Sequence, residues 1–239
     1  MPTPTLLDYP SGELDAMAQA HNYYRWILDG WRPLLGRVAL EFGAGIGTFS
    51  AHLLQEPIER LFLVEPAPAL GARLETRFRS HDRVRVLSGV LEDFRVELGN
   101  RAIDSILSVN VLEHIDDDGA TLRAARDILI PGGRLFIFVP AFQFLYGSLD
   151  RTFGHVRRYT RGGLLAKVRS LGFDVVSSRY MNLLGTLFWL VAGRVLRQRT
   201  LAPGAVALAD RMLIPVSSGL ERWFRPPFGQ NLMVVARKP

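Results

Sequence analysis

A carboxylate and three alternating glycines occur at the end of a short apolar run. The run covers residues 38–42 and includes Glu41. The glycines that follow are Gly43, Gly45 and Gly47. This pattern predicts a buried strand followed by a turn in which the backbone can touch a ligand. A dinucleotide fingerprint would place its third glycine where this chain has Thr48, so the spacing argues against a nicotinamide cofactor.

A second carboxylate follows at the separation that a nucleoside site requires. Glu65 ends the apolar run 60–65, about 20 residues after the glycines, where an acid can accept hydrogen bonds from ribose hydroxyls. Pro66 then turns the chain toward a helix. The combined pattern resembles motif I of the class I S-adenosylmethionine-dependent methyltransferases. The resemblance implies that Glu41 helps hold the methionine end of S-adenosyl-L-methionine. It also implies that the glycine loop with Ala44 passes beneath the cofactor, and that Glu65 grips both ribose hydroxyls.

The ends of the third and fourth apolar runs carry further candidates for the cofactor site. The resemblance implies that Asp93, or equally Glu92, accepts a hydrogen bond from the adenine amino group, and that Asn110 lines the methionine moiety. His114 is either a general base, because its ordinary pKa lies near neutrality, or an anchor for the following loop. The acids 116–118 fit the N-terminus of the next helix better than a metal cluster, so we expect no metal.

A segment rich in aromatic, acidic and basic residues follows the fifth run. Its twin arginines can clamp a carboxylate or phosphate, and its histidine, aspartate and tyrosines can orient or deprotonate a nucleophile. A structural loop held by an Arg–Asp pair is the alternative. The spacing resembles a bacterial methyltransferase subgroup associated with glycan, lipid or secondary-metabolite pathways. The candidate catalytic residues here are His155 and Tyr146, and the candidate substrate residues are Asp150, Arg157, Arg158 and Tyr159.

Strands that alternate with helices must position these residues. The alternation predicts one α/β domain over residues 1–239, with a Rossmann-like, doubly wound, mostly parallel seven-stranded sheet covered by helices on both faces. The resemblance implies that this is a single methyltransferase domain. We expect an N-terminal helix over 11–33, the cofactor-binding core over 36–180, a helical insertion or lid over 181–229 and the last strand over 230–239. Tyr23, on the N-terminal helix, can touch the cofactor's carboxylate or sulfonium, with core packing as the alternative.

The insertion contains an apolar run that is too short to span a bilayer. Residues 183–193 are mostly apolar and are followed by Arg194, Arg197 and Arg199, whereas a span takes about 20 residues. The run is either a buried lid helix or an interfacial helix that makes peripheral membrane contact through 183–199. A second amphipathic piece covers 205–224, with a bend or break expected at Pro215.

Composition narrows the partners only in part. The 239 residues include no cysteine, which excludes disulfides and thiolate catalysis. The formal charge is +6, and all but two of the 29 basic residues are arginine, which suits nucleic acid, an anionic membrane or an acidic substrate. The first residues show no secretory pattern, so we expect a cytoplasmic protein, with membrane association as the alternative.

These observations together predict methyl transfer from S-adenosyl-L-methionine to an oxygen, nitrogen or carbon of a small-molecule or lipid- or glycan-linked acceptor. An RNA methyltransferase, a non-catalytic cofactor-binding protein and an NAD(P)-dependent oxidoreductase are the alternatives. The lack of an appended RNA-binding motif argues against nucleic acid as the partner. Nucleobase N-methylation in particular is disfavoured because residues 110–112 read Asn-Val-Leu. Methyltransferases of exocyclic base amines resemble one another in an Asn/Asp-Pro-Pro-aromatic motif at this position.

Overall fold

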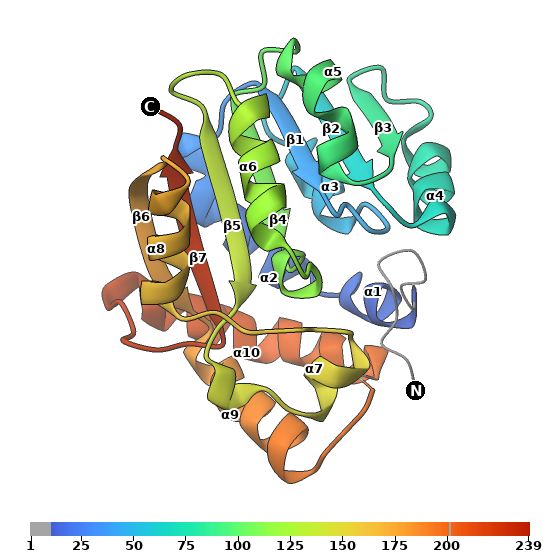
Figure 1. Cartoon of the computed structure of the whole chain (residues 1–239). Coiled ribbons are helices and arrows are strands. Elements are labelled where there is room, and N and C mark those ends of the chain that lie inside the picture. The colour runs from blue at the N-terminus through green and yellow to red at the C-terminus, as the bar shows by residue number, and fades with distance from the viewer. Residues whose placement is uncertain (1–10, 201) are drawn as a thin grey trace.

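A seven-stranded sheet forms the centre of the molecule (Figure 1). The computed structural model describes residues 11–200 and 202–239, so the expectation about the first residues lies outside the described part. The strand order is β3-β2-β1-β4-β5-β7-β6, and only β7 runs antiparallel to its neighbours. The predicted doubly wound, mostly parallel sheet is therefore confirmed. The strands are β1 Val38–Phe42, β2 Arg60–Glu65, β3 Val84–Ser88, β4 Ser105–Val109, β5 Arg134–Pro140, β6 Asp174–Met181 and β7 Asn231–Arg237.

Helices cover both faces of the sheet because successive strand residues point to opposite sides. On β5, Leu135 and Ile137 join the core beneath α5, α6 and α8, whereas Phe136 and Phe138 join the core beneath α2, α3 and α4. The helices are α2 His21–Trp31, α3 Thr48–Leu53, α4 Pro68–Phe78, α5 Arg95–Gly99, α6 Asp118–Ile128 and α8 Arg161–Ser170. Short 3₁₀ turns lie at η2 Arg32–Leu34, η3 Leu91–Phe94, η4 Leu112–His114 and η5 Gln143–Leu145.

The N-terminal segment forms two helices where one was expected. α1 Ser11–Met17 ends before α2, and Leu14 of α1 packs against a small cluster that contains Ile46 of the glycine loop. Ala20 offers no side-chain cap to α2. The carboxylate of Asp210 caps it instead, accepting hydrogen bonds from the backbone N–H groups of Asn22 at 2.9 Å and Tyr23 at 2.8 Å. A cap supplied from 187 residues away has no local sequence signal.

The insertion lies below the carboxyl edge of the sheet (Figure 1). It contains α9 Leu183–Trp189, the π-helical turn η6 Leu190–Val195 and α10 Pro203–Trp223, and α7 Ser148–Thr152 packs against η6. The chain is not broken at Pro215, because α10 runs through it as one helix. Arg211 and Pro215 are both exposed, so water can satisfy the carbonyl that the proline leaves without a donor.

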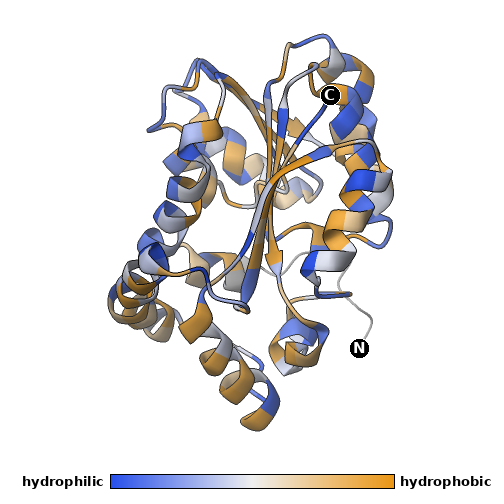
Figure 2. Cartoon of the chain, turned by 90° about the vertical axis from the view of Figure 1, so that its left-hand side faces the viewer, coloured by the Kyte–Doolittle hydropathy of each residue, from blue (hydrophilic) through white to orange (hydrophobic). Residues whose placement is uncertain are grey.

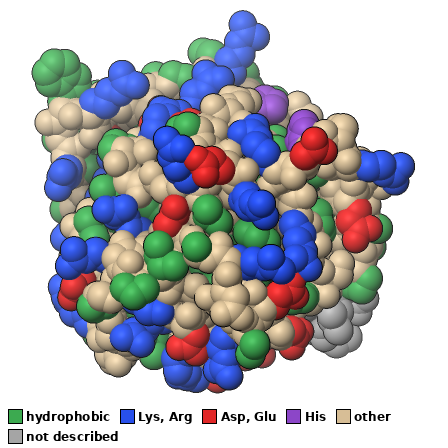
Figure 3. Space-filling view, turned by 90° about the horizontal axis from the view of Figure 1, so that it is seen from above, with side chains coloured by type: hydrophobic (Ala, Val, Ile, Leu, Met, Phe, Trp, Pro, Cys, Tyr) green, Lys and Arg blue, Asp and Glu red, His purple; other side chains and the backbone are tan. Residues whose placement is uncertain are grey.

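The two ends of the molecule differ in surface character. Figure 2 shows hydrophobic residues along the helices below the sheet. The opposite end, seen in Figure 3, carries basic side chains interspersed with acidic and apolar ones. No helix in the described part of the chain is both long and apolar enough to cross a bilayer.

Candidate cofactor and acceptor site

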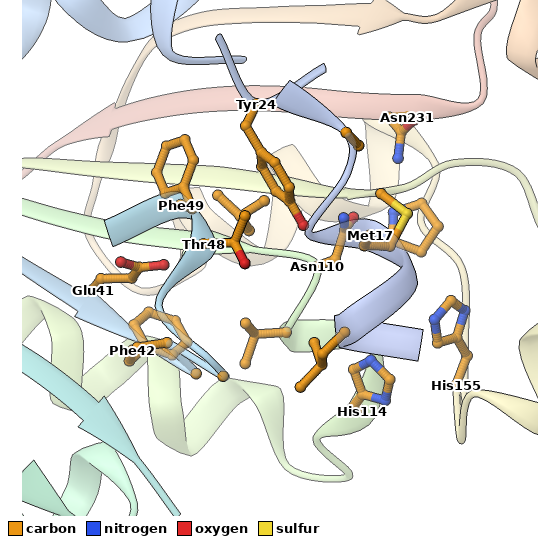
Figure 4. A pocket seen from close by; sticks show the side chains of 18 of the residues that line it. Met17, Tyr24, Glu41, Phe42, Thr48, Phe49, Asn110, His114, His155 and Asn231 are labelled. Atoms are coloured by element: carbon orange, nitrogen blue, oxygen red, sulfur yellow. The ribbon is translucent and has the colours of Figure 1, made fainter. Parts of the chain in front are cut away.

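A cavity of about 470 Å³ lies at the carboxyl ends of β1, β2 and β4. Ligands of doubly wound sheets bind at this edge because the parallel strands there end together. The glycine loop, α1, α2 and the insertion helices α9 and α10 enclose the cavity. Figure 4 shows Glu41 at one end and His114, His155 and Asn231 toward the other.

The glycine loop has a backbone that other residues would strain. Gly43, Gly45 and Gly47 have φ angles of 68°, 57° and 77°, in the left-handed region. A Cβ atom on Gly43 would lie 2.5 Å from the Val111 side chain, and one on Gly47 would lie 2.5 Å from the Phe78 ring. The loop therefore needs glycine for both its conformation and its close packing, and Ala44, Gly43 and Gly45 line the cavity.

Glu65 joins the glycine loop to the end of β2. Its Oε2 accepts a hydrogen bond from the Gly45 N–H at 2.8 Å, and its Oε1 accepts one from the Ala67 N–H at 3.0 Å. Burial raises the pKa of this carboxyl above its ordinary value, although the two N–H donors oppose the shift. A carboxylate has about four acceptor positions, so Glu65 retains two for ligand hydroxyls. Glu65 and Pro66 both line the cavity.

Glu41 is a buried acid that holds its proton more tightly than an exposed glutamate. It is 3% exposed, and the Ser50 hydroxyl donates a hydrogen bond to its Oε2 at 2.6 Å. Burial raises the pKa of Glu41 to about 8, and the nearby charge of Glu65 adds to the shift. Such a group binds a cation well, because a positive ligand restores the charge that burial disfavours.

The two candidate acids after β3 take different positions. Glu92 lines the cavity and accepts a hydrogen bond from the Thr121 hydroxyl at 2.5 Å. Asp93 is exposed, is absent from the cavity lining, and accepts a hydrogen bond from the Val90 N–H at 3.3 Å. The 3₁₀ turn η3 therefore directs Glu92, together with Leu91, toward the cavity.

The middle of the cavity is polar on one wall. Asn110 has φ 53°, and its N–H donates to the carbonyl of Phe138 at 2.8 Å. The Tyr23 hydroxyl is hydrogen-bonded to the side chains of Asn110 and Asn231, and burial raises its pKa. All three residues line the cavity. Asn231, at the start of β7, has no motif around it in the sequence and was not foreseen.

Asp150 organises the far end of the cavity. It is fully buried, and its Oδ1 lies 2.8 Å from His155 Nδ1 and accepts from Arg158 Nε at 2.7 Å. Its Oδ2 accepts from Trp189 Nε1 at 3.1 Å and from the Gly147 N–H at 2.8 Å. Burial alone would raise the pKa of Asp150, but His155 and the Arg158 guanidinium outweigh it and lower it to about 2. Asp150 therefore stays ionised and fixes three side chains at once.

The twin arginines are separated. Arg158 lines the cavity, lies over the Trp189 ring at 5.0 Å and donates from Nη1 to the Ala141 carbonyl. Its buried Nη2 has no hydrogen-bond partner within the described chain. Arg157 instead binds the Asp116 carbonyl and the Asp118 carboxylate outside the cavity. Only Arg158 thus offers an unused donor to a ligand.

The two tyrosines of the same segment support it from outside the cavity. The Tyr146 hydroxyl donates to the His155 carbonyl at 2.7 Å, and neither tyrosine lines the cavity. The Tyr159 hydroxyl lies 2.7 Å from Asp118 Oδ2 and 3.0 Å from the Leu112 carbonyl. These contacts hold the loop against η4.

His114 and His155 face each other at the far end (Figure 4). Their ring centroids lie 4.8 Å apart, edge to face. Burial and the neighbouring His155 lower the pKa of His114 to about 3, and burial lowers that of His155 despite its bond to Asp150. Both imidazoles are therefore neutral near pH 7, and their lowered pKa values make them weak proton acceptors.

The geometry fits a nucleoside with ribose hydroxyls and a cationic end, and comparisons with known proteins agree. A family model described as a methyltransferase domain matches residues 40–135. A ubiquinone biosynthesis O-methyltransferase of Chelativorans sp. (strain BNC1) is 26% identical over 225 residues, covering 87% of this chain and 74% of the relative. One from Xanthomonas axonopodis pv. citri (strain 306) is 30% identical over 147 residues, covering 54% of this chain and 61% of the relative.

A solved structure shares the fold. Phosphoethanolamine N-methyltransferase 2 of Haemonchus contortus, in complex with S-adenosyl-L-methionine, superposes with a TM-score of 0.65 at 16% identity. The match covers 100% of this chain and 60% of that one. Together with the sheet order, the family match over residues 40–135 identifies a methyltransferase domain of the S-adenosylmethionine-dependent kind, whose methyl donor is S-adenosyl-L-methionine.

Proposed function

We propose that this enzyme methylates a hydroxyl oxygen of an apolar small-molecule or lipid-linked acceptor. The observation that carries the proposal is the far half of the cavity, which continues from the glycine loop to apolar walls on α9 and α10. These walls are formed by Val206, Leu213, Ile214, Phe188 and Trp189. The names of the curated relatives, O-methyltransferases of ubiquinone biosynthesis, support oxygen as the reacting atom.

Different residues along the cavity would bind different parts of the cofactor. Glu65 would accept the ribose hydroxyls with its two remaining acceptor positions, and Glu41 would pair with the cationic methionine end. Glu92, with Leu91 beside it, would meet the adenine. S-adenosyl-L-methionine supplies a methyl group that its sulfonium makes electrophilic. The protein's main contribution is then to hold the acceptor oxygen in line with that group and to exclude water.

Arg158 and the histidine pair would orient the acceptor. The buried Nη2 of Arg158 can donate a hydrogen bond to an acceptor oxygen, and such bonds from a charged donor are among the stronger ones. The apolar walls would take the hydrophobic body of the acceptor. An acceptor with one oxygenated end and one hydrophobic end fits both features.

The outer face of the insertion favours an anionic membrane surface as the source of this acceptor. Exposed side chains on α9, η6 and α10 include Leu187, Val195, Leu208, Met212 and Trp223, the last 92% exposed. All six basic residues of segment 183–228 are exposed arginines, and its only acids, Asp210 and Glu221, are buried. Apolar side chains flanked by arginines are typical of helices that lie in the headgroup region.

Vesicle flotation tests the membrane part. Wild type should float with phosphatidylserine-containing vesicles and far less with pure phosphatidylcholine. The double variant Leu187→Ser/Trp223→Ser should lose flotation, whereas Val96→Ser, a matched change at a 78% exposed position on α5, should not. Equal flotation of both variants would remove this surface from the proposal.

Transfer of labelled methyl tests the reaction. Purified protein and labelled S-adenosyl-L-methionine are incubated with lipid, aqueous and RNA fractions of a cell extract. We expect label in the lipid or apolar fraction, and loss of that label in Glu65→Ala. Label in RNA would show that the acceptor is RNA and not an apolar molecule. Binding of the cofactor without transfer to any fraction would indicate a non-catalytic protein.

A further inference from the structure

Three residues that line the cavity each carry a buried polar atom without a hydrogen-bond partner in the described part of the chain. The atoms are Thr48 Oγ1, Arg158 Nη2 and Asn231 Oδ1. Arg158 and Asn231 belong to the far end, whereas Thr48 lies at the opposite end, directly after the glycine loop. Buried polar atoms are nearly always paired, so the Thr48 hydroxyl needs a partner from the cavity, which is a ligand or a water molecule.

The start of α3 directs the Thr48 hydroxyl toward the cavity. Thr48 is the first residue of this helix and follows Gly47, whose backbone is left-handed. Ser50, two residues further along, donates to the Glu41 carboxylate at 2.6 Å. Residues two apart on a helix do not face the same way, so Thr48 is left to face the cavity when Ser50 faces β1. In Figure 4 the Thr48 hydroxyl points into the cavity, in a row of polar groups that runs from Glu41 to Asn110.

The charged side chains in this half of the cavity are acids. Glu41, Glu65 and Glu92 line it, and among the described residues Arg158 is the one lysine or arginine in the cavity lining. Arg158 lies at the far end, where its Nε donates to Asp150 at 2.7 Å. The methionine end of the cofactor carries both an ammonium and a carboxylate. The acids suit the ammonium, but the carboxylate has to be held by neutral donors, such as a hydroxyl.

We propose that the Thr48 hydroxyl donates a hydrogen bond to the α-carboxylate of S-adenosyl-L-methionine, and that this contact selects a cofactor with a complete amino-acid end. The ammonium and the carboxylate of the cofactor are attached to one carbon atom, so neighbouring side chains have to bind them. Glu41 and Thr48 meet this requirement, because both line the same end of the cavity. The inference rests on the pairing of Glu41 with the ammonium in the proposed function, and not on the acceptor.

Three ligands with successively smaller methionine ends test the contact by calorimetry. S-adenosyl-L-methionine carries both charged groups, decarboxylated S-adenosylmethionine keeps the sulfonium and the ammonium, and 5′-methylthioadenosine keeps only the nucleoside thioether. Thr48→Val removes the hydroxyl and keeps the branched shape. Its affinity for S-adenosyl-L-methionine should be about 10- to 100-fold lower than that of wild type, because a hydrogen bond to a charged group is lost. Its affinities for the other two ligands should stay within about threefold of wild type, because neither has a carboxylate.

Two further variants serve as controls. Thr48→Ser keeps the hydroxyl and should bind S-adenosyl-L-methionine within about threefold of wild type. Thr76→Val is a matched change at an exposed position on α4 and should bind all three ligands as wild type does. Binding of 5′-methylthioadenosine also shows that a variant is folded. If Thr48→Val binds none of the three ligands, Thr48→Ala decides the result by the same comparison.

Three results would overturn the inference. Unchanged affinity of Thr48→Val for S-adenosyl-L-methionine would show that the hydroxyl does not contact the cofactor. An equal loss for all three ligands, or loss of all binding in both Thr48→Val and Thr48→Ala, would place the effect in the glycine loop. An equal loss for S-adenosyl-L-methionine and its decarboxylated form, with 5′-methylthioadenosine unaffected, would assign Thr48 to the ammonium.

The acceptor is tested separately. Failure of labelled-methyl transfer to the apolar fraction would count against the proposed function, and it would leave the comparison of the three ligands unaffected. Loss of the carboxylate contact would in turn leave the acceptor class unchanged.

Discussion

Glu41→Gln should have opposite effects in two assays. It should make the fold more stable without cofactor, and it should weaken the binding of S-adenosyl-L-methionine. Without cofactor, burial raises the pKa of Glu41 from 4.5 to about 8. Between these values the folded protein keeps a proton that the unfolded chain has lost. A raised carboxyl pKa therefore makes the fold less stable as pH rises from 4.5 toward 8. Glutamine has nearly the same shape, still accepts the Ser50 hydroxyl and does not titrate.

The size of the effect follows from the two pKa values of Glu41. From pH 5 to pH 7 the linkage removes about 2–3 kcal/mol from the wild-type unfolding free energy. Glu41→Gln does not titrate and so lacks this loss. The difference in unfolding free energy between variant and wild type should therefore move by about 2–3 kcal/mol in favour of the variant over that range.

In the presence of the cofactor, Glu41→Gln should be at a disadvantage, because it should bind the cofactor less tightly than wild type. A carboxyl with a pKa of about 8 is about one-tenth ionised at pH 7, so pairing with the cationic end of the cofactor should release about 0.9 proton. Glutamine replaces a charged hydrogen bond with a neutral one, a loss of about 1–1.5 kcal/mol or about five- to tenfold in affinity. The variant should release no such proton.

Two measurements check the reasoning. Urea unfolding at pH 5, 6 and 7 without cofactor gives the stability difference, with the exposed Glu75→Gln as the control that should show no such trend. Calorimetry with S-adenosyl-L-methionine in two buffers of different ionisation enthalpy gives the proton release. If the stability curves of variant and wild type run parallel and both release the same number of protons, Glu41 is not the titrating group.

Four further substitutions test the fold and the proposed cofactor site. Gly47→Ala should lower the unfolding free energy by about 2–4 kcal/mol in a urea titration, because Gly47 has a left-handed backbone and a Cβ atom there would lie 2.5 Å from Phe78. Gly219→Ala is the matched control. Gly219 lies within α10 and a Cβ atom there would meet no neighbour, so the change should raise the unfolding free energy by about 0.5–1 kcal/mol. Asp210→Ala should cost about 1–2 kcal/mol and expose the start of α2 to hydrogen exchange, since α2 loses its cap; unchanged exchange there would contradict this assignment. Glu65→Gln should lower the affinity for S-adenosyl-L-methionine at least about tenfold by calorimetry, because one backbone N–H loses its acceptor and the ribose hydroxyls lose a charged acceptor. Full affinity would count against the ribose contact.

The sheet was predictable because its signals are local. Strands β1, β2, β4 and β5 each contain a short apolar run, and the helices between them favour parallel pairing. Glu41 and Glu65 each stand at or near the end of such a run. Parallel strands end at one edge, so the predicted topology alone brought these two residues to a common cavity.

Local pattern could not choose between neighbouring residues. Glu92 and Asp93, like Arg157 and Arg158, are adjacent and chemically alike, and the chain conformation alone decides which of each pair lines the cavity. The 3₁₀ turn η3 directs Glu92 and not Asp93 toward the cavity. The ion pair with Asp118 holds Arg157 outside the cavity, which leaves Arg158 in its lining.

By itself, then, the sequence determined the α/β class of the sheet, the glycine loop and the positions of Glu41 and Glu65 beside it, because periodicity and spacing are properties of short stretches. Tertiary structure alone decided the acceptor end, where Asp150 joins Gly147, His155 and Arg158 to Trp189 of the insertion. It alone also decided the cap of α2 by Asp210. Those contacts join segments far apart in the chain, and their energy comes from burial and geometry that no local run of residues records.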